Sequence, residues 1–238
     1  MAPDMVHHIY EANPSLYAAP HYDWVDGDRS KITYPDPATL PRRTARERRL
    51  AELVEQATQI PREQQTFMQR NYMYQLGLSG LPIDTTHLPT AMHPSRQLKT
   101  LPDYSRHASA TIVSAALRDI IESVEPDTHI FHPVRIVAKN GREYGTMYML
   151  YVCNVLHAVR PDSPGWYLHK GFMWKREPVE AGSDVEPELV FDAAKVAGTH
   201  MWVDVQMPSP VTLLSNTLAE RIAAADFPTV GLTAYREV

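Results

Sequence analysis

The sequence predicts an α+β fold: a mixed or antiparallel sheet with packed helices, an internal strand-helix-strand repeat and a helical N-terminal region. The first observation is the repeat, because residues 111–137 return 101 residues later as residues 212–238 without a gap. The second is that the remaining segments alternate between strand and helix patterns. We therefore expect two parts: residues 1–99 as an irregular region with a helical hairpin, and residues 100–238 as an α+β domain with an internal duplication.

Each copy of the repeat predicts a short apolar strand, a serine, a short helix and a second strand. Ser114 and Ser215 occupy the position where the side-chain oxygen of a helix N-cap accepts a free backbone N–H. Apolar residues then follow at helical spacing, which predicts one buried face on each helix. These residues are Leu117, Ile120, Ile121 and Val124 in the first copy, and Leu218, Ile222 and Ala225 in the second.

The region 1–99 combines irregular, aromatic-rich sequence with two predicted helices. Because disordered tails are usually poor in aromatic residues, we expect residues 1–40 to wrap onto the main body. Residues 42–59 have an apolar helical stripe, and Pro61 opens a second helix at the first-turn position that proline tolerates. Four prolines interrupt residues 79–106, which we expect to form a long loop.

The dipeptide Asn140-Gly141 separates two apolar runs and predicts a β-hairpin with a type I′ turn. The second run is apolar on both faces, so we expect it to be a central strand. Residues 157–187, marked by proline and glycine, form an insertion. Further strands are predicted at Leu189 to Phe191, Met201 to Val205, Val211 to Leu214 and Leu232 to Val238.

Composition narrows the class of protein. The chain is 44% hydrophobic and has a formal net charge of −5, so nothing attracts it strongly to nucleic acid or anionic membrane. The basic run Arg42 to Arg49 alternates with glutamates and predicts a solvated helix face. Its single cysteine, Cys153, excludes an internal disulfide, and no apolar stretch has the length of a signal peptide or a membrane span. We expect a cytoplasmic protein; its oligomeric state stays open.

No motif predicts a cofactor, a metal site or a catalytic centre. His129 and His132 are three residues apart on a predicted strand, where alternation points them to opposite faces and away from a shared ion. The pair His7-His8 lies near a flexible end. Cys153 lies in the most apolar strand, where a thiol is usually an inert core residue. Nucleophile elbows and phosphate-binding glycine loops are absent from the sequence.

Two features of the C-terminal half predict a surface for a protein partner. The aromatic residues of the insertion form a binding hot spot or anchor the insertion on the core. The run from Glu177 to Asp192 has several acidic residues and no basic one, so it is a solvated loop or a surface for a basic partner. Basic partners include nuclease-type toxins, which need positive charge to hold nucleic acid. The candidate contact residues are Trp166, Tyr167, Trp174, Glu177, Glu180, Asp184, Glu186 and Glu188.

Short motifs in a fixed order indicate a family. One set is Val113-Ser114-Ala115-Ala116-Leu117, Phe131-His132-Pro133-Val134, Asn154-Val155-Leu156-His157-Ala158-Val159 and Asp162-Ser163. The other set is Val190-Phe191-Asp192, Gly198-Thr199-His200-Met201-Trp202, Leu214-Ser215-Asn216-Thr217-Leu218 and Gly231-Leu232. In this order, over roughly residues 100–238, they resemble the immunity proteins of bacterial polymorphic toxin systems, a family long classed as a domain of unknown function.

The resemblance implies a protein that binds and neutralises a cognate toxin delivered between neighbouring, competing bacteria. The family has no agreed catalytic residues, so none is carried over, and we expect neither an enzyme nor a cofactor. The expected mechanism is stoichiometric occlusion of the toxin. The alternative is an enzyme that reverses the toxin's modification, or an unrelated hydrolase, and a nucleic-acid-binding regulator is a third class that the net charge disfavours.

Overall fold

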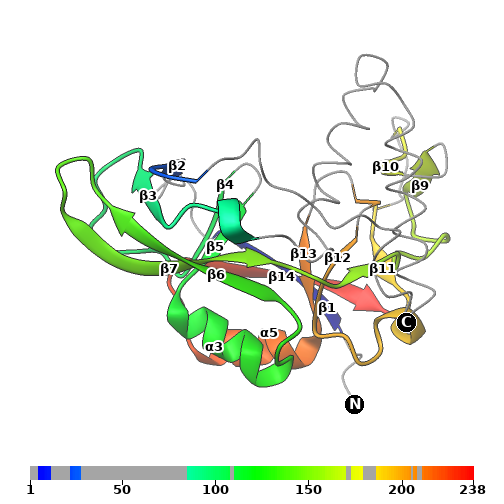
Figure 1. Ribbon diagram of the computed structural model, residues 1–238. Coiled ribbons are helices and arrows are strands. Elements are labelled where there is room, and N and C mark those ends of the chain that lie inside the picture. The colour runs from blue at the N-terminus through cyan, green and yellow to red at the C-terminus, as the bar shows by residue number, and fades with distance from the viewer. Residues whose placement is uncertain are drawn as a thin grey trace.

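The computed structural model describes residues 5–11, 22–27, 85–107, 110–169, 173–178, 186–204, 206–207 and 211–238. Two six-stranded sheets form the body of this part of the molecule (Figure 1). Sheet I has the order β2(Tyr22–Trp24), β3(Ala91–Pro94), β6(Ile130–Val137), β7(Glu143–Tyr151), β5(Ala110–Val113), β4(Tyr104–His107). Sheet II has the order β11(Val190–Phe191), β14(Val230–Glu237), β1(Met5–Glu11), β13(Thr212–Leu214), β12(Met201–Asp204), β8(Val155–Leu156). A separate hairpin consists of β9(Trp166–His169) and β10(Met173–Arg176).

Strands dominate the described residues, which contain fourteen strands, three α-helices and one 3-10 helix. The helices α3(Ala115–Val124) and α5(Asn216–Ala224) lie side by side against the sheets (Figure 1). The other two, α4(Ala193–Val196) and η2(Thr85–His87), are single turns. The fold is therefore mostly β with two curled sheets, and the predicted α+β class is wrong.

The N-terminal residues account for much of this difference. The segments predicted as helices, residues 42–59 and the helix from Pro61, lie outside the described residues. The described N-terminal residues form β1 and β2, so the helical N-terminal region is corrected to strands there. β1 lies between β13 and β14 and buries Val6 on one face and Ile9 on the other. This pattern lacks two-residue periodicity, so the sequence does not predict the strand.

Two smaller expectations about loops and ends also change. The pair His7-His8 lies within β1, a central strand, and not at a flexible end. The described part of the expected loop 79–106 contains η2, β3 and β4. β3 pairs with β6 in parallel and β4 pairs with β5 antiparallel, so both strands are short additions to sheet I. Strands of four residues have too few positions to give a recognisable alternation.

The hairpin predicted at Asn140-Gly141 is confirmed, because β6 and β7 pair antiparallel on either side of it. The turn type is different. Gly141 has a φ of +86° and its N–H donates to the carbonyl of Ala138 at 2.9 Å, whereas Asn140 has no positive φ. This is a type I turn closed by a left-handed glycine, and not a type I′ turn. β7 lies between β6 and β5, which confirms the predicted central strand.

The repeat folds into the same unit twice. In the first copy, β5 and β6 are joined by α3 and lie on either side of β7; in the second, β13 and β14 are joined by α5 and lie on either side of β1. The registers agree: Phe131 pairs with Leu150, and its repeat equivalent Leu232 pairs with Ile9. The outer strands correspond as well. β4 pairs antiparallel with β5 as β12 does with β13, and β3 pairs in parallel with β6 as β11 does with β14. Each sheet therefore contains one copy of the duplicated unit, and each copy consists of five strands and one helix.

The predicted N-caps are confirmed in both copies. Ser114 (φ −69°, ψ 163°) and Ser215 (φ −68°, ψ 160°) are extended and stand directly before their helices. The Ser114 hydroxyl accepts the N–H of Leu117 at 3.2 Å, and the Ser215 hydroxyl accepts that of Leu218 at 3.3 Å. Each hydroxyl satisfies one donor that the first helical turn leaves free.

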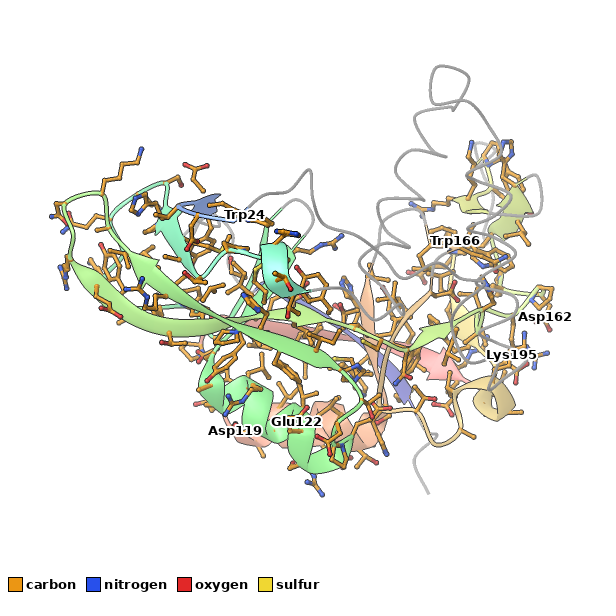
Figure 2. The ribbon with its side chains drawn as sticks, viewed as in Figure 1. Trp24, Asp119, Glu122, Asp162, Trp166 and Lys195 are labelled. Carbon is orange, nitrogen blue, oxygen red and sulfur yellow. The ribbon has the colours of Figure 1, made fainter. Side chains whose placement is uncertain are left out.

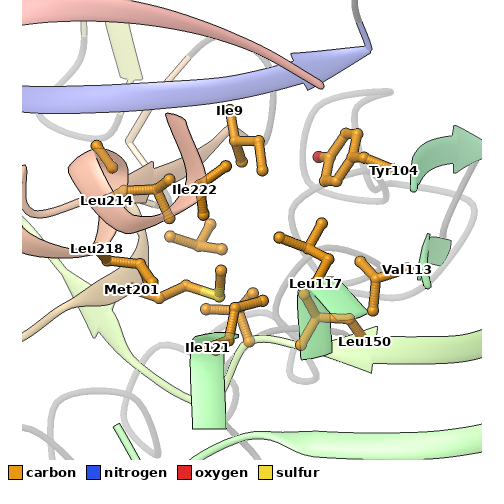
Figure 3. Packing of buried hydrophobic residues seen from close by; sticks show 13 residues of the cluster. Ile9, Tyr104, Val113, Leu117, Ile121, Leu150, Met201, Leu214, Leu218 and Ile222 are labelled. Carbon is orange, nitrogen blue, oxygen red and sulfur yellow. The ribbon is translucent and has the colours of Figure 1, made fainter. Parts of the chain in front are cut away.

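Three clusters of buried side chains hold the sheets. The helix cluster lies between the two repeat helices and both sheets (Figure 3) and includes Ile9, Leu117, Ile121, Leu150, Met201, Leu214, Leu218 and Ile222. A second cluster, which includes Ile112, Val134 and Met147, belongs to sheet I, and a third, which includes Phe191, Trp202 and Leu213, belongs to sheet II. Ala225, predicted on the buried face of α5, is an exposed C-cap, and Ala219 is buried on that face instead. The helix cluster therefore joins the two copies.

Candidate partner-binding surface

The β9–β10 hairpin turns one face to the core beside sheet II. Leu168 pairs with Trp174, and Trp166 points to the same face as Leu168 because side chains two residues apart share a face. Trp174 is 2% exposed and belongs to the cluster of sheet II. Trp166, labelled in Figure 2, and Leu168 are half-buried against that cluster. These apolar side chains anchor the insertion on the core.

The opposite face of the hairpin points to solvent. Tyr167 is 38% exposed, and its ring centroid lies 5.9 Å from that of His169 in an edge-to-face arrangement. Of the three aromatic candidates, Trp174 and Trp166 therefore serve as anchors, and Tyr167 is accessible. The sequence left these two roles open because the register of the hairpin decides which residues face the core.

The hairpin brings separate parts of the acidic run to one turn. The N–H of Glu177 donates to the carbonyl of Gly165 at 2.8 Å, and the N–H of Glu188 donates to the carbonyl of Pro164 at 3.0 Å. This turn requires glycine, because Gly165 has a φ of +68° and a Cβ there would lie 2.9 Å from the Cβ of Pro187. The Gly165 turn therefore fixes the positions of both glutamate backbones.

Basic side chains neutralise part of the acidic surface. Glu188 pairs with Arg236 at 2.9 Å. Nearby, Arg160 pairs with Asp162 at 2.8 Å and Lys195 with Asp192 at 3.7 Å; Figure 2 labels Asp162 and Lys195. The hydrogen bonds from Arg160 hold the pKa of Asp162 below its usual value. Exposed pairs of this kind stabilise the fold little, but they reduce the charge that a partner meets.

Two of the candidate acidic residues are free to meet a partner. Glu177 and Glu186 are exposed and form no ion pair with another described residue. Glu180 and Asp184 lie outside the described residues. The surface that combines exposure with unpaired acidic charge therefore contains Tyr167, Glu177 and Glu186.

A buried polar network that the sequence did not predict joins the two copies of the repeat. The carboxylate of Glu125 accepts hydrogen bonds from His129 Nε2 at 3.1 Å, Asn154 Nδ2 at 2.7 Å and the N–H of Met201 at 2.9 Å. Glu125 follows α3 in the first copy, whereas Met201 begins β12 in the second. Its partners are up to 76 residues away, so no local pattern points to it.

Glu125, His129 and Cys153 lie close together, but their hydrogen bonds are not those of a catalytic Glu-His-Cys triad. His129 Nδ1 accepts the backbone N–H of Cys153 at 3.1 Å, and its Nε2 contacts Glu125, so both ring nitrogens are engaged. The Cys153 thiol contacts the carbonyl of Tyr151 at 3.4 Å. Burial raises the pKa of this thiol, which keeps it protonated. These contacts are those of a structural network.

Asp204 is a second buried carboxylate that sequence reasoning missed. Its Oδ2 accepts the N–H of Ala158 at 2.9 Å, and its Oδ1 accepts the N–H of Gln206 at 2.9 Å. Asp204 is fully buried, and burial raises its pKa, with the nearby charge of His157 acting in the opposite direction. The carboxylate thus ties the beginning of the insertion to the end of β12.

The histidines that invited a metal hypothesis have separate partners. His129 contacts Glu125, while His132 Nε2 lies 2.9 Å from the carbonyl of Pro89. Over the ranges that the structure describes, no group of three histidine, cysteine, aspartate or glutamate side chains is arranged to hold a metal ion. In the same ranges no helix has the length and apolar character needed to cross a membrane.

A comparison with known protein families identifies the family of this chain. The model of an immunity protein family, Imm11, matches residues 20–236. The chain belongs to the Imm11 family. This confirms the resemblance to immunity proteins, and the match extends it from roughly residue 100 back to residue 20. None of the curated proteins with which the chain was compared matches it. Membership in Imm11 supports a general function in immunity against a toxin.

Proposed function

We propose that this Imm11 protein acts in the bacterial cytoplasm by binding a cognate toxin one-to-one and covering the toxin's active surface. Family membership supports the immunity role, and the arrangement of the β9–β10 hairpin supports direct binding. The observation that carries the proposal is the exposed Tyr167 on a hairpin whose opposite face is fixed by the buried Trp174. A surface held rigid before binding loses little conformational entropy when it meets its partner.

The charges of this surface favour a basic toxin domain, such as a nuclease. Glu177 and Glu186 are exposed and unpaired within the described residues, so their carboxylates remain available to lysine and arginine side chains. Glu180 and Asp184 of the same run would add to this attraction, whereas Arg236 offsets the charge of Glu188. Complementary charge accelerates association, and Tyr167 supplies the apolar contact typical of an interface centre. An interface of ordinary size would bury about 1,200–2,000 Å².

The stoichiometry of protection tests the mechanism. Purified chain is titrated into the toxin encoded beside it, while toxin activity and complex formation by size-exclusion chromatography are measured in parallel. We expect inhibition to be complete near one equivalent and to coincide with a stable complex. Protection at a small fraction of one equivalent, without a complex, would support an enzyme that reverses the toxin's modification.

The contact surface is tested by a double charge reversal, Glu177→Lys with Glu186→Lys. We expect the association rate with the toxin to fall about tenfold at low salt, with a smaller change at high salt, because the lost attraction acts at long range. The matched control is Asp119→Lys with Glu122→Lys, which makes the same change of charge on α3 (Figure 2). Equal effects of the two variants would exclude the hairpin surface and leave the one-to-one mechanism standing.

A further inference from the structure

Basic residues gather at the far end of sheet I, away from the β9–β10 hairpin. The turn of the β6–β7 hairpin contributes Lys139 and Arg142, and the loop after β3 contributes Arg96 and Lys99. All four residues are exposed. In Figure 1 this end of β6 and β7 lies beside β3, at the opposite end of the molecule from β9 and β10. We call these four residues the basic tip.

A hydrogen bond and an aromatic contact, both made by Tyr144, hold the two segments of the basic tip together. The Tyr144 hydroxyl accepts the N–H of Leu98 at 3.1 Å, which fixes the loop that contains Arg96 and Lys99 against β7. The guanidinium carbon of Arg142 lies 5.1 Å above the centroid of the Tyr144 ring. Stacking on an aromatic ring orients a guanidinium group without satisfying its hydrogen-bond donors. Tyr144 is therefore the centre around which the basic residues are arranged.

The turn itself is ordered by backbone hydrogen bonds. The N–H of Ala138 donates to the carbonyl of Arg142 at 2.7 Å, and the Asn140 side chain accepts the N–H of Arg142 at 3.1 Å. Lys139 therefore projects from a closed turn and not from a free loop. A fixed turn keeps its cations at constant separation, which favours binding of a complementary set of charges.

The four residues of the basic tip lack acidic partners among the described residues, unlike four basic residues elsewhere on the surface. Elsewhere Arg118, Arg160, Lys195 and Arg236 each pair with an aspartate or glutamate. Within the described ranges, none of the four residues of the basic tip forms an ion pair. Residues 95–100 and 138–143 contain a single acidic residue, Glu143. The basic tip is therefore a group of positively charged side chains on a chain whose net charge is −5.

We propose that the basic tip binds an acidic polypeptide segment of a protein partner. Arginine and lysine donors at fixed positions match carboxylates on a neighbouring strand or loop, and the oriented guanidinium of Arg142 suits bidentate contact with one carboxylate. Nucleic acid fits less well, because a polyanion that continued beyond these four cations would meet a protein of net negative charge. The inference does not depend on the toxin contact proposed for β9–β10.

The test measures the binding of a fluorescein-labelled decapeptide of alternating glutamate and glycine to the full chain by fluorescence anisotropy at low salt. We expect Lys139→Glu with Arg142→Glu to lower the affinity about tenfold, because two attractive contacts become repulsive. The matched control is Arg160→Glu with Lys195→Glu, which changes the charge equally at the other end of the molecule and is expected to lower the affinity less than twofold. Circular dichroism of all variants confirms that they are folded.

Three outcomes would overturn the proposal. Equal losses in the two double variants would mean that the peptide senses only net charge. Tighter binding of a single-stranded oligonucleotide with the same number of charges would identify a nucleic-acid site. Self-association of the wild-type chain that disappears in Lys139→Glu with Arg142→Glu would make a second copy the occupant.

Discussion

Glu125 joins the two copies of the repeat through hydrogen bonds to His129, Asn154 and the backbone of Met201. Burial alone would raise the pKa of Glu125, but the hydrogen bond and charge of His129 and the N–H of Met201 hold it below the usual value. The unfolded chain therefore binds this proton more tightly than the folded one. The contribution of Glu125 to stability is complete above the ordinary glutamate pKa, about 4.3, and is lost as pH falls through the folded pKa.

The substitution Glu125→Gln tests this contribution. We expect it to lower the free energy of unfolding by about 1–3 kcal/mol at pH 7, because buried donors lose their charged acceptor. We also expect the variant to lose less stability than the wild type between pH 6 and pH 3, as measured by urea unfolding at several pH values. Glu122→Gln on the outer part of α3 is the control. If both variants followed the pH dependence of the wild type, Glu125 would not be the titrating group.

At the residue scale, local roles could be predicted and distant partners could not. Ser114 and Ser215 were predicted as caps because a cap acts on a residue three positions away. The pairing of Glu125 with Met201, and the burial of Asp204, depend on residues that only the fold brings together. For the same reason, the exposure of Tyr167 and the burial of Trp174 were not separable from the sequence.

At the scale of elements, two glycines with positive φ allow backbone strain to be separated from steric contact. A Cβ at Gly141 would meet nothing within 4 Å, whereas a Cβ at Gly165 would lie 2.9 Å from Pro187. We expect Gly141→Ala to lower the free energy of unfolding by about 1 kcal/mol, because alanine is strained in the left-handed backbone conformation. Gly165→Ala is expected to cost at least about 1 kcal/mol more, since Pro187 must also move.

Urea unfolding of both glycine variants measures these costs, and the Gly165 variant has a second readout. Because the Gly165 turn holds the backbones of Glu177 and Glu188, its distortion is expected to weaken toxin binding as well. Gly141→Ala should leave toxin binding unchanged. Equal stability of the two variants would mean that the Pro187 contact relaxes without cost.

Sequence patterns predict some single elements well. Two examples are the hairpin at Asn140-Gly141 and the second repeat helix, α5. Both depend on residues within one turn of each other, and both were predicted correctly in position. The turn type was wrong because Asn140 accepts the N–H of Arg142 in a type I geometry that the dipeptide alone does not distinguish. β3 and β4 were missed because their stability comes from β6 and β5, not from their own sequence.

At the scale of the whole molecule, β1 completes the second copy of the duplication. Val6 is fully buried in the cluster of sheet II, and Val25 is 49% exposed. We expect Val6→Ala to lower the free energy of unfolding by about 2 kcal/mol, because it removes buried methyl groups and leaves a cavity. Val25→Ala, the same chemical change at an exposed site, is expected to cost less than about 0.5 kcal/mol. Chemical unfolding of both variants measures the difference; similar losses would mean that β1 contributes little to sheet II.

The position of β1 also affects the order in which the protein can fold during synthesis. In the first copy the central strand is β7, which follows β5 and β6 directly in the sequence. These three strands are therefore synthesised one after another. The strand that fills the second copy contains His7, which bonds to Asn216 across 209 residues. During synthesis β1 therefore has no partner strands in sheet II until β13 and β14 have been translated. Contacts this distant in sequence slow folding and expose strand edges meanwhile, so we expect the first copy to form early and the second to set the overall rate.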